Sequence, residues 1–442
     1  MTSLRKQAPF SQIVLAVAIA RTRLHNGASL NTVLQPSLQR LPQDSRPVAQ
    51  ALIYESVRHH AQNRALITLL CARIPSQDVI SLLETSLTAL NTSKISAFTI
   101  VSETVNAAKS HHTTRKASGL INAVLRRYLR EKNDLLASLS TNEEVQYNLP
   151  HWWIEYIRHC YPTHADSVLA LGTQHPPLTL RINVKKTDLT TYTSHLKEQN
   201  LSYRQVGLEA IELLEPIPVE QIPGFNDGLC SVQDAGTQLA AHLLPIKQGD
   251  RVLDACAAPG GKTAHLLEKY QCELTALEID PTRTAKIQEN LHRLQLKAKV
   301  ITANANKLST WWDGQLFDAI LLDAPCTASG VVRRQPDTPW LRRRQDIKNL
   351  ASEQAKLLTN LWPLLKPNGK LLYATCSIFP EEGELQVQQF LSRTKNAVLV
   401  PLFPGNTGIL TLLPEEKPTY EKHDLLPSVH DGFFYALLEK RA

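Results

Sequence analysis

The 442-residue chain has few cysteines and no close grouping of metal-ligand residues. It has seven cysteines, which is an odd number, and no two of them form a C-x-x-C pair. Both facts argue against a disulfide framework and against a zinc site made of cysteines. The adjacent histidine pairs, at positions 59 and 60 and at 111 and 112, lack the i, i+4 spacing of a helical metal site. We therefore expect free thiols, a reducing cytoplasmic setting and no metal.

The sequence also lacks an apolar run long enough to span a bilayer. Residues 13–20 follow two basic residues and imitate the apolar core of a signal peptide. That run is short, and Arg21 and Arg23 follow it directly, after which a helical pattern continues. We predict a core helix of a bundle at this position and no membrane partner.

The chain has an ordinary proportion of charged residues and a mildly basic net charge. Hydrophobic residues make up 43% of the chain and charged residues 20%, which is typical of a globular protein of two or three domains. The net charge of +7 fits a polyanionic partner such as nucleic acid. A solvated basic surface explains the same charge equally well.

The pattern of apolar residues divides the chain into three parts. Residues 1–140 are predicted to be helical, and residues 141–235 to form a connector and a small α+β subdomain. Residues 236–442 alternate strand and helix, with strands expected at 251–254, 274–278, 298–302, 317–323 and 369–374. That alternation predicts an α/β fold with a doubly wound, mostly parallel sheet, and residues 431–438 are expected to add a final antiparallel strand.

One helix of the first part carries a basic face. Its apolar positions recur with helical spacing and predict a single buried stripe, formed by Leu120, Ile121, Val124, Leu125, Tyr128 and Leu129. The opposite face carries Arg126, Arg127 and Arg130. Such a face either contacts solvent alone or binds RNA phosphates, and residue types do not decide between the two.

A small-residue turn after the strand at 251–254 is the candidate cofactor site. Gly260 and Gly261 there let the backbone approach a ligand closely. The sequence Gly261-Lys262-Thr263 imitates the end of an ATP-binding loop, but Cys256 stands where that motif needs glycine. G-x-G-x-x-G is also absent, which argues against a dinucleotide site. The remaining interpretation is a site for S-adenosylmethionine.

Residues at the ends of the following strands support this interpretation. Glu278 ends the second strand, where a carboxylate can accept hydrogen bonds from ribose hydroxyls. Asn304 follows the third strand, and its amide can pair with an adenine edge. The full set expected to bind the cofactor is Cys256, Ala257, Ala258, Pro259, Gly260, Gly261, Lys262, Glu278, Asn304 and Asp323.

Two later strands each deliver a cysteine to the same edge of the sheet. Asp323 and Cys326 follow the strand at 317–323, and Cys376 follows the strand at 369–374. Open α/β sheets bind ligands at the carboxyl ends of their strands. A thiolate that adds to carbon 6 of a pyrimidine makes carbon 5 nucleophilic, a carboxyl group can neutralise ring nitrogen 3, and a base then removes the hydrogen at carbon 5. The chemistry alone leaves open which cysteine attacks.

These motifs resemble the RNA 5-methylcytosine methyltransferases, specifically the bacterial RsmB group, which methylates 16S ribosomal RNA. The resemblance covers nearly the whole chain and rests on residues 255–263, 323–326, 330–334, 336–337, 374–377, 380–382 and 431–434. Residues 119–126 are similar to the RNA-binding domain of the antitermination factor NusB. The resemblance implies a Rossmann-like methyltransferase domain preceded by an all-α NusB-like bundle.

The resemblance also implies roles and partners. Cys376 is expected to attack carbon 6, and Cys326 to serve in product release, whereas the related DNA enzymes use the cysteine that follows proline as nucleophile. Arg333 and Arg334 are expected to hold RNA phosphates. We expect a cytoplasmic monomer that acts on 16S ribosomal RNA, unassembled or partly assembled.

Two residues depart from the family's pattern, which usually has aspartate where Glu278 and Asn304 stand. These differences put cofactor affinity in question rather than the reaction type. Within the same enzyme class, a transfer RNA substrate is the second possibility. A non-catalytic RNA-binding or antitermination protein is the alternative from another class, but such a protein would not need two strand-end cysteines beside Asp323.

Overall fold

A computed structural model describes residues 8–414 and 423–442, which fold into two compact units. The first, here the helical unit, contains the chain up to Gln174 together with Val332–Arg343. The second, here the sheet unit, contains His175–Val331 and Arg344–Ala442. The chain therefore leaves the sheet unit after residue 331, contributes twelve residues to the helical unit and returns. The three-part division drawn from the sequence stays a prediction.

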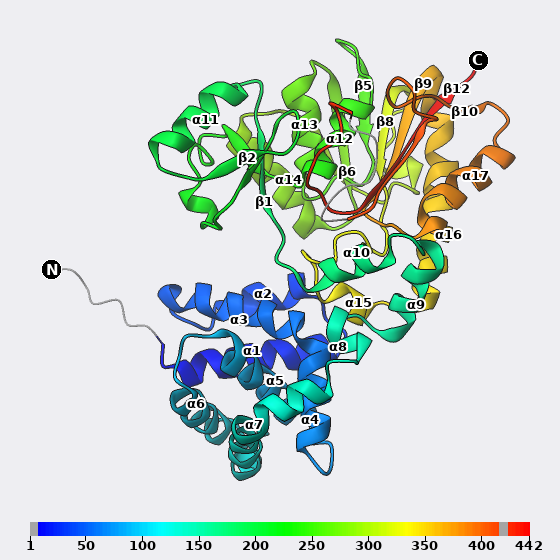
Figure 1. Ribbon diagram of the computed structural model, residues 1–442. Coiled ribbons are helices and arrows are strands. Elements are labelled where there is room, and N and C mark those ends of the chain that lie inside the picture. The colour runs from blue at the N-terminus through cyan, green and yellow to red at the C-terminus, as the bar shows by residue number, and fades with distance from the viewer. Residues whose placement is uncertain (1–7, 415–422) are drawn as a thin grey trace. The chain divides into compact units, whose positions relative to one another are not determined.

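The helical unit is a bundle built around α1 (Figure 1). Ile13, Val14 and Val17 of this helix are buried, so the predicted core helix is confirmed. No helix among the described residues is long and apolar enough to cross a membrane. The helices are α1 (Phe10–His25), α2 (Leu30–Leu38), α3 (Arg46–Arg58), α4 (His60–Leu70), α5 (Gln77–Thr92), α6 (Ala97–Ser110), α7 (Ser118–Ser138), α8 (Glu143–Tyr147), α9 (His151–Cys160), α10 (Ala165–Ala170) and α15 (Thr338–Leu341).

The apolar stripe of α7 is narrower than the sequence predicts. Its central residues are buried, but Leu120 is 45% exposed and Leu129 is 39% exposed. The six predicted positions span more of the helix circumference than its neighbours cover. Only the positions that directly face the other helices lose contact with water.

A buried ionic network lies at the centre of the helical unit. The Arg21 guanidinium donates to Glu84 at 2.9 Å and to Nδ1 of His60 at 2.7 Å. The edge of the Trp340 ring packs on His60, with 4.4 Å between ring centroids. Leu30 also donates its N–H to the Asp337 carboxylate at 2.8 Å. Trp340 and Asp337 thus anchor the 332–343 segment in this unit.

The main sheet of the sheet unit has eight strands, and β5 to β9 run parallel where they pair. The order is β10-β12-β9-β8-β5-β6-β7, with β11 paired to β12. β12 runs antiparallel to β9, so the predicted mostly parallel sheet with a final antiparallel strand is confirmed. The strands are β5 (Arg251–Asp254), β6 (Glu273–Glu278), β7 (Lys299–Thr302), β8 (Phe317–Asp323), β9 (Leu365–Thr375), β10 (Ala397–Leu399), β11 (Ile409–Leu412) and β12 (Phe433–Lys440).

Helices cover both faces of this sheet (Figure 1). α12 (Ala235–Leu243), α13 (Gly261–Lys269) and α14 (Pro281–Leu294) pack on one face, and α16 (Arg344–Leu361) and α17 (Glu384–Arg393) on the other. Leu321 belongs to the first core and its neighbours Ile320 and Leu322 to the second. A strand that is apolar on both sides reads as a continuous hydrophobic run, as β8 does.

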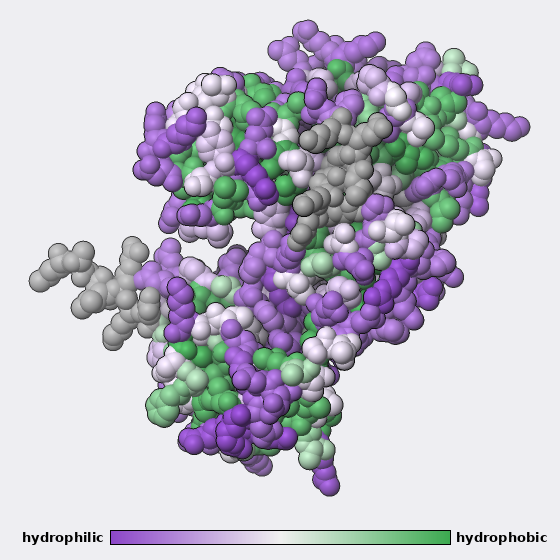
Figure 2. Space-filling view, viewed as in Figure 1, coloured by the Kyte–Doolittle hydropathy of each residue, from purple (hydrophilic) through white to green (hydrophobic). Residues whose placement is uncertain are grey.

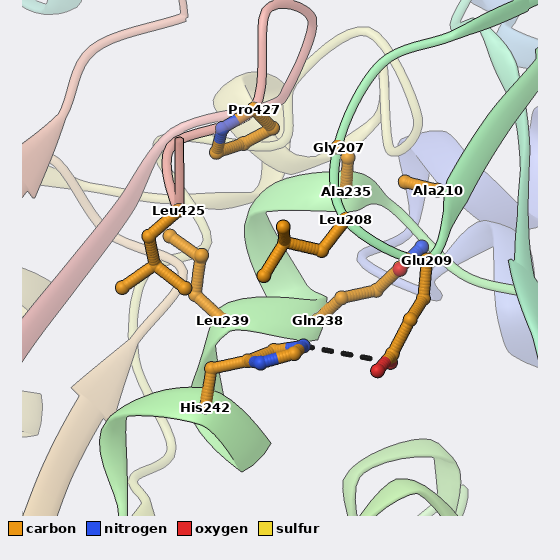
Figure 3. Close-up of a pocket in the computed structure, with 10 residues that line it drawn as sticks. All are labelled: Gly207, Leu208, Glu209, Ala210, Ala235, Gln238, Leu239, His242, Leu425 and Pro427. Carbon is orange, nitrogen blue, oxygen red and sulfur yellow. Dashed lines mark ion pairs between the residues drawn. The ribbon is translucent and has the colours of Figure 1, made fainter. Parts of the chain in front are cut away.

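A small antiparallel sheet precedes the main one, with strand order β2-β3-β1-β4. Its elements are β1 (Leu178–Ile182), α11 (Leu189–Glu198), β2 (Tyr203–Gln205), β3 (Ala210–Leu213) and β4 (Cys230–Val232). Figure 3 shows Glu209, just before β3, pointing toward His242 of α12, with 3.4 Å between Oε2 and Nε2. His265 of α13 approaches the same oxygen at 2.8 Å. Glu209 therefore ties the small sheet to two helices of the main domain.

Candidate active site

The turn between β5 and α13 holds the residues predicted to bind a cofactor. Gly260 has a φ of +96°, and a Cβ there would lie 3.2 Å from the Cα of Ile287 in α14. Gly260 is therefore needed for the left-handed turn and for packing against α14. This differs from the expected reason, which was the approach of a ligand to its backbone.

One buried arginine fixes the far side of this turn. Arg181 of β1 donates Nη1 to the carbonyl of Gly261 at 2.9 Å. Its Nε and Nη2 donate to the two carboxylate oxygens of Glu268 in α13, at 2.9 and 2.7 Å. Arg181 is 1% exposed. Arg181 thus contacts the first residue of α13 and a residue two turns later. It therefore fixes the position of the helix and of the loop that precedes it.

Sequence reasoning missed Arg181. The available signal was an arginine in the middle of a predicted strand, flanked by Leu180 and Ile182. The partners that explain it lie 80 and 87 residues further along the chain.

Acidic and amide groups gather at the carboxyl ends of the parallel strands. Asp254 ends β5, is fully buried and accepts a hydrogen bond from Thr263 Oγ1 at 2.6 Å. Burial raises the pKa of this carboxyl to about 7. Among the described residues, its second oxygen has no hydrogen-bond partner. The polar environment of this strand end is thus incomplete without a further group.

The two following strands bring Glu278 and Asn304 to the same edge. Glu278 ends β6, is 3% exposed and accepts the N–H of Asp280 at 3.0 Å. Asn304 follows β7 and accepts the N–H of Asn306 through Oδ1 at 2.9 Å. The Asn304 Oδ1 is therefore engaged locally, and its amide nitrogen is the group suited to donate to a purine acceptor. These groups fit a ligand with ribose hydroxyls and a purine edge.

The structure brings the two strand-end cysteines together. Cys326 follows β8 and Cys376 follows β9, and their sulfur atoms lie 3.4 Å apart as free thiols. The pKa of Cys326 is raised well above its usual value, first by its hydrogen bond to Cys376 and then by burial. Either thiol can donate its S–H to the other at this distance.

A cation and a carboxylate lie beside the thiols. Lys262 of the cofactor turn donates to Asp323 Oδ2 at 2.7 Å. Burial acts to lower the pKa of Lys262, but Asp323 and the other negative groups nearby together raise it. A negative charge on Cys376 contributes in the same direction, so the Lys262 ammonium and the Cys376 sulfur interact.

A second carboxylate, that of Glu382, links the loop that carries Cys326 to the loop that carries Cys376. It is fully buried and accepts hydrogen bonds from the N–H and hydroxyl of Thr327, at 2.9 and 2.5 Å. It also accepts from the Ser377 hydroxyl at 2.6 Å. Thr327 directly follows Cys326, and Ser377 directly follows Cys376. Glu382 therefore couples the positions of the two sulfur atoms.

The sequence pointed to residues 380–382 as a motif but assigned them no role. Glu382 was missed because its partners come from two loops fifty residues apart. The available signal was a glutamate a few residues after a buried strand that ends at Thr375, with Ser377 between them in the sequence. A carboxylate that is buried near such hydroxyls needs several hydrogen-bond donors.

Close backbone contact explains two further motifs. A Cβ on Gly330 would lie 2.3 Å from the carbonyl oxygen of Gly432, so any larger residue there would force the backbone to move. Gly432 donates its N–H to Gly330 at 2.8 Å, and Gly330 donates to the carbonyl of Cys376 at 3.0 Å. The residues before β12 thus brace the loop that carries Cys326.

The predicted RNA-binding arginines lie in the helical unit. Arg126 and Arg130 are exposed on α7, and Arg127 pairs with Glu131 at 2.9 Å. Arg333 is 8% exposed and Arg334 is half-buried, both in the 332–343 segment. Their contact with RNA stays a prediction.

Comparison with known families places these features in a class. Residues 241–439 match the family described as 16S rRNA methyltransferase RsmB/F. Residues 149–220 match the ferredoxin-like domain of RsmF/B-like methyltransferases, and residues 5–130 match the NusB family. The protein is a methyltransferase, and its cofactor is S-adenosylmethionine.

Individual relatives narrow the class to one family. The chain is 38% identical over 422 residues to a ribosomal RNA small subunit methyltransferase B of Vibrio vulnificus, covering 94% of this chain and 96% of the relative. It is 41% identical over 351 residues to the Vibrio cholerae protein of the same name, covering 79% and 78%. The chain belongs to the ribosomal RNA small subunit methyltransferase B family.

Solved structures share the fold. The protein PH0851 superposes with a TM-score of 0.80 at 23% identity, covering 98% of this chain and all of that one. A methyltransferase homologue from Pyrococcus horikoshii gives a TM-score of 0.56 at 26% identity, covering 68% of this chain and 98% of that one.

Proposed function

We propose that this protein transfers a methyl group to carbon 5 of a cytosine in 16S ribosomal RNA through a covalent bond between Cys376 and carbon 6. The observation that supports it most is the pair of free thiols 3.4 Å apart at the ends of neighbouring parallel strands. Two thiols at one strand edge suit a reaction that needs both a sulfur nucleophile and a second group on the same ring.

Electrostatics favour Cys376 as the nucleophile. The Lys262 ammonium interacts with the Cys376 sulfur, and the Cys326 sulfur lies 3.4 Å from it. A cation beside a cysteine sulfur is typical of a nucleophilic cysteine. Cys326 instead faces the Glu382 carboxylate, whose charge raises the pKa of the Cys326 thiol. The charges around the two sulfurs therefore favour Cys376 over Cys326 as the nucleophile.

The ion pair of Lys262 and Asp323 supplies the proton that the addition requires. When the Cys376 sulfur bonds to carbon 6, negative charge develops on the ring, and protonation of nitrogen 3 neutralises it. Asp323 lies at the end of β8 and already shares a short hydrogen bond with the Lys262 ammonium. A proton can pass from this pair to the ring without water.

Release of the product falls to Cys326. S-adenosylmethionine, when bound, supplies the methyl group, and carbon 5 then carries both the methyl group and a hydrogen. Once Cys376 is bonded to carbon 6, Cys326 gives its own proton to solvent and becomes a thiolate. It then accepts the hydrogen of carbon 5 as a proton, the carbon 5–carbon 6 double bond reforms and the sulfur of Cys376 leaves as thiolate. Nitrogen 3 returns its proton to the pair of Lys262 and Asp323. The factor that most raises the pKa of Cys326 is its contact with Cys376. Because that sulfur is neutral once bonded to carbon 6, Cys326 loses its proton more easily at the step that needs a base.

The remaining proposed contacts hold the substrates. Residues 256–262, Glu278, Asn304 and Asp323 bind the cofactor, and the target cytosine leaves its stack to reach the sulfurs. Arg126, Arg127, Arg130, Arg333 and Arg334 contact RNA phosphates, and the protein acts in the cytoplasm as a monomer on unassembled or partly assembled RNA. Replacing the three α7 arginines should weaken binding to all RNA sequences and lower the salt dependence of binding.

A methyl-transfer assay tests the proposal. The purified protein with labelled S-adenosylmethionine should modify unmodified 16S ribosomal RNA at one cytosine, located by bisulfite sequencing. Transfer RNA offered at the same concentration serves as the competing substrate. Product in transfer RNA alone would replace the ribosomal assignment, and binding of RNA without any product would indicate a non-catalytic protein.

A further inference from the structure

The helical unit has an open groove between α6 and α7 that the proposed chemistry does not use. The groove has a volume of about 430 Å³ and draws residues from one face of each helix. On α6 these residues recur every three or four positions, as one helix face requires, and on α7 likewise. They are Phe98, Val101, Ser102, Val105, Asn106 and Lys109 of α6, and Ser118, Gly119, Asn122 and Arg126 of α7.

Phe98 stands at the rim of this groove in the first turn of α6. Its side chain is 79% exposed, far more than the exposed leucines of α7. Ser96 caps the helix just before it, accepting the N–H of Thr99 at 3.2 Å, so the turn forms without help from the phenyl ring. The ring is therefore accessible to a molecule that enters the groove.

Gly119 lies on the facing helix, and the fold does not require it there. A Cβ at this position would meet no heavy atom within 4 Å, and its φ is not in the left-handed region. Glycine within a helix is less stable than alanine by about 0.5–1 kcal/mol. Because Gly119 has no side chain, another molecule can approach the backbone of α7 closely at this point of the groove.

The polar groups of the groove suit a polyanion with hydrogen-bonding edges. Lys109 and Arg126 supply positive charge, and no carboxylate lines the groove. The nearby Glu103 does not line the groove, and it accepts from the Ser11 N–H and from the amide of the groove residue Asn106, both at 3.0 Å. Hydrophobic patches set among hydrophilic residues also appear over α6 and α7 in Figure 2.

We propose that this groove binds an unpaired stretch of the RNA substrate, with one base stacked on Phe98 and its phosphates near Lys109 and Arg126. An exposed aromatic ring beside cations and amides is how proteins hold single strands, since duplex bases are not free to stack on a side chain. The inference rests on the proposed function for the identity of the RNA.

Three single variants and a control test the groove in the full-length protein. Binding to a fluorescent single-stranded oligoribonucleotide is measured by anisotropy across salt concentrations. Phe98→Ala should weaken binding about 5- to 100-fold, the usual range for one base–aromatic stack. Lys109→Gln should lower the salt slope by about one. Leu69→Ala, an exposed residue of α4 that does not line the groove, should bind like the wild type.

Gly119→Leu separates binding from folding. A leucine side chain should fill the groove and weaken binding at least tenfold, while the thermal midpoint stays the same or rises because leucine favours helix. Wild-type affinity in both Phe98→Ala and Gly119→Leu would overturn the proposal. So would unchanged binding to naked RNA together with lost binding to small-subunit particles, which would make the groove a protein-docking site. If the wild type binds RNA in the groove but makes no 5-methylcytosine, the proposed function fails while the groove assignment stands.

Discussion

At the scale of single residues, two sulfur atoms of the same chemistry differ because of what surrounds each. Glu382 lies behind the Cys326 loop and Lys262 interacts with Cys376. The surroundings of the two sulfurs therefore differ in charge: a carboxylate raises the pKa of Cys326, and an ammonium group interacts with Cys376. The different roles proposed for the two cysteines thus follow from the charged groups that surround each sulfur.

Glu382 gives the sharpest prediction at this scale. Glu382→Gln should lower kcat about 10- to 100-fold, because an amide nitrogen would face donors where the carboxylate accepts four hydrogen bonds. KM for S-adenosylmethionine should stay unchanged. The charge of Glu382 raises the pKa of Cys326, so the pH–rate limb that reports Cys326 should move to lower pH.

Glu384→Gln is the matched control, since that carboxylate is exposed on α17 and bonds only to Gln388 among the described residues. Glu382→Asp should recover part of kcat. A loss of kcat with no shift of the pH profile would show that Glu382 acts on folding alone.

At the scale of elements, the site depends on how α13 is held. Arg181 of the small sheet pairs with Glu268 inside the protein, and the same guanidinium binds the carbonyl of Gly261 in the cofactor turn. α13 begins at the cofactor turn and is held in place by Arg181. A change at Arg181 should therefore displace the cofactor turn.

Arg181→Met should therefore reduce both stability and cofactor affinity. Removing one partner of a buried pair leaves the Glu268 carboxylate uncompensated, which costs about 3–5 kcal/mol. The double variant Arg181→Met with Glu268→Leu should regain most of the stability but not the cofactor affinity, measured by calorimetric titration. Arg204→Met is the control, because its ion pair with Glu212 is 54% exposed on the arginine side and contributes about 1 kcal/mol or less.

Full recovery of cofactor affinity in the double variant would mean that the loop does not depend on the Arg181–Gly261 contact.

The elements themselves were largely predictable from sequence. The strands at 251–254 and 317–323 have the predicted bounds, because buried parallel strands read as short apolar runs between turn residues. Convergence of Cys326 and Cys376 followed from strand ends alone. The roles of Arg181 and Glu382 did not, because each depends on partners brought together by tertiary packing. The reason for Gly260 was also missed, since only the fold places Ile287 against it.

At the scale of the whole molecule, each unit contains a buried neutral histidine. The pKa of His60 in the helical unit is lowered to about 3, first by burial and then by Arg21. The pKa of His265 in the sheet unit is lowered to about 3, first by burial and then by Arg181. Both histidines gain protons on unfolding between pH 6.5 and pH 3.

Stability should therefore fall as the solution is acidified. Each group contributes stability that is fully present above its unfolded pKa of 6.5 and is lost as the pH falls toward 3. The loss is about 1.4 kcal/mol per pH unit for each histidine. Urea unfolding at pH 7.5, 6.5 and 5.5 measures it, and His265→Asn should flatten the dependence of the sheet unit. Asp254, whose pKa is raised to about 7, acts in the opposite direction over this range, so the comparison of the wild type with His265→Asn carries the test. Equal pH dependence in these two proteins would contradict the assignment of His265.

The measurement that tests the central claim most directly is mass spectrometry of the denatured protein after reaction with RNA and S-adenosylmethionine. Cys326→Ala should methylate once and remain joined to the RNA through a thioether at Cys376 that reducing agents do not break. Cys376→Ala should still bind cofactor and RNA but form neither adduct nor product, and Asp323→Ala should block the addition itself. A trapped adduct in Cys376→Ala, with none in Cys326→Ala, would contradict the account and make Cys326 the nucleophile.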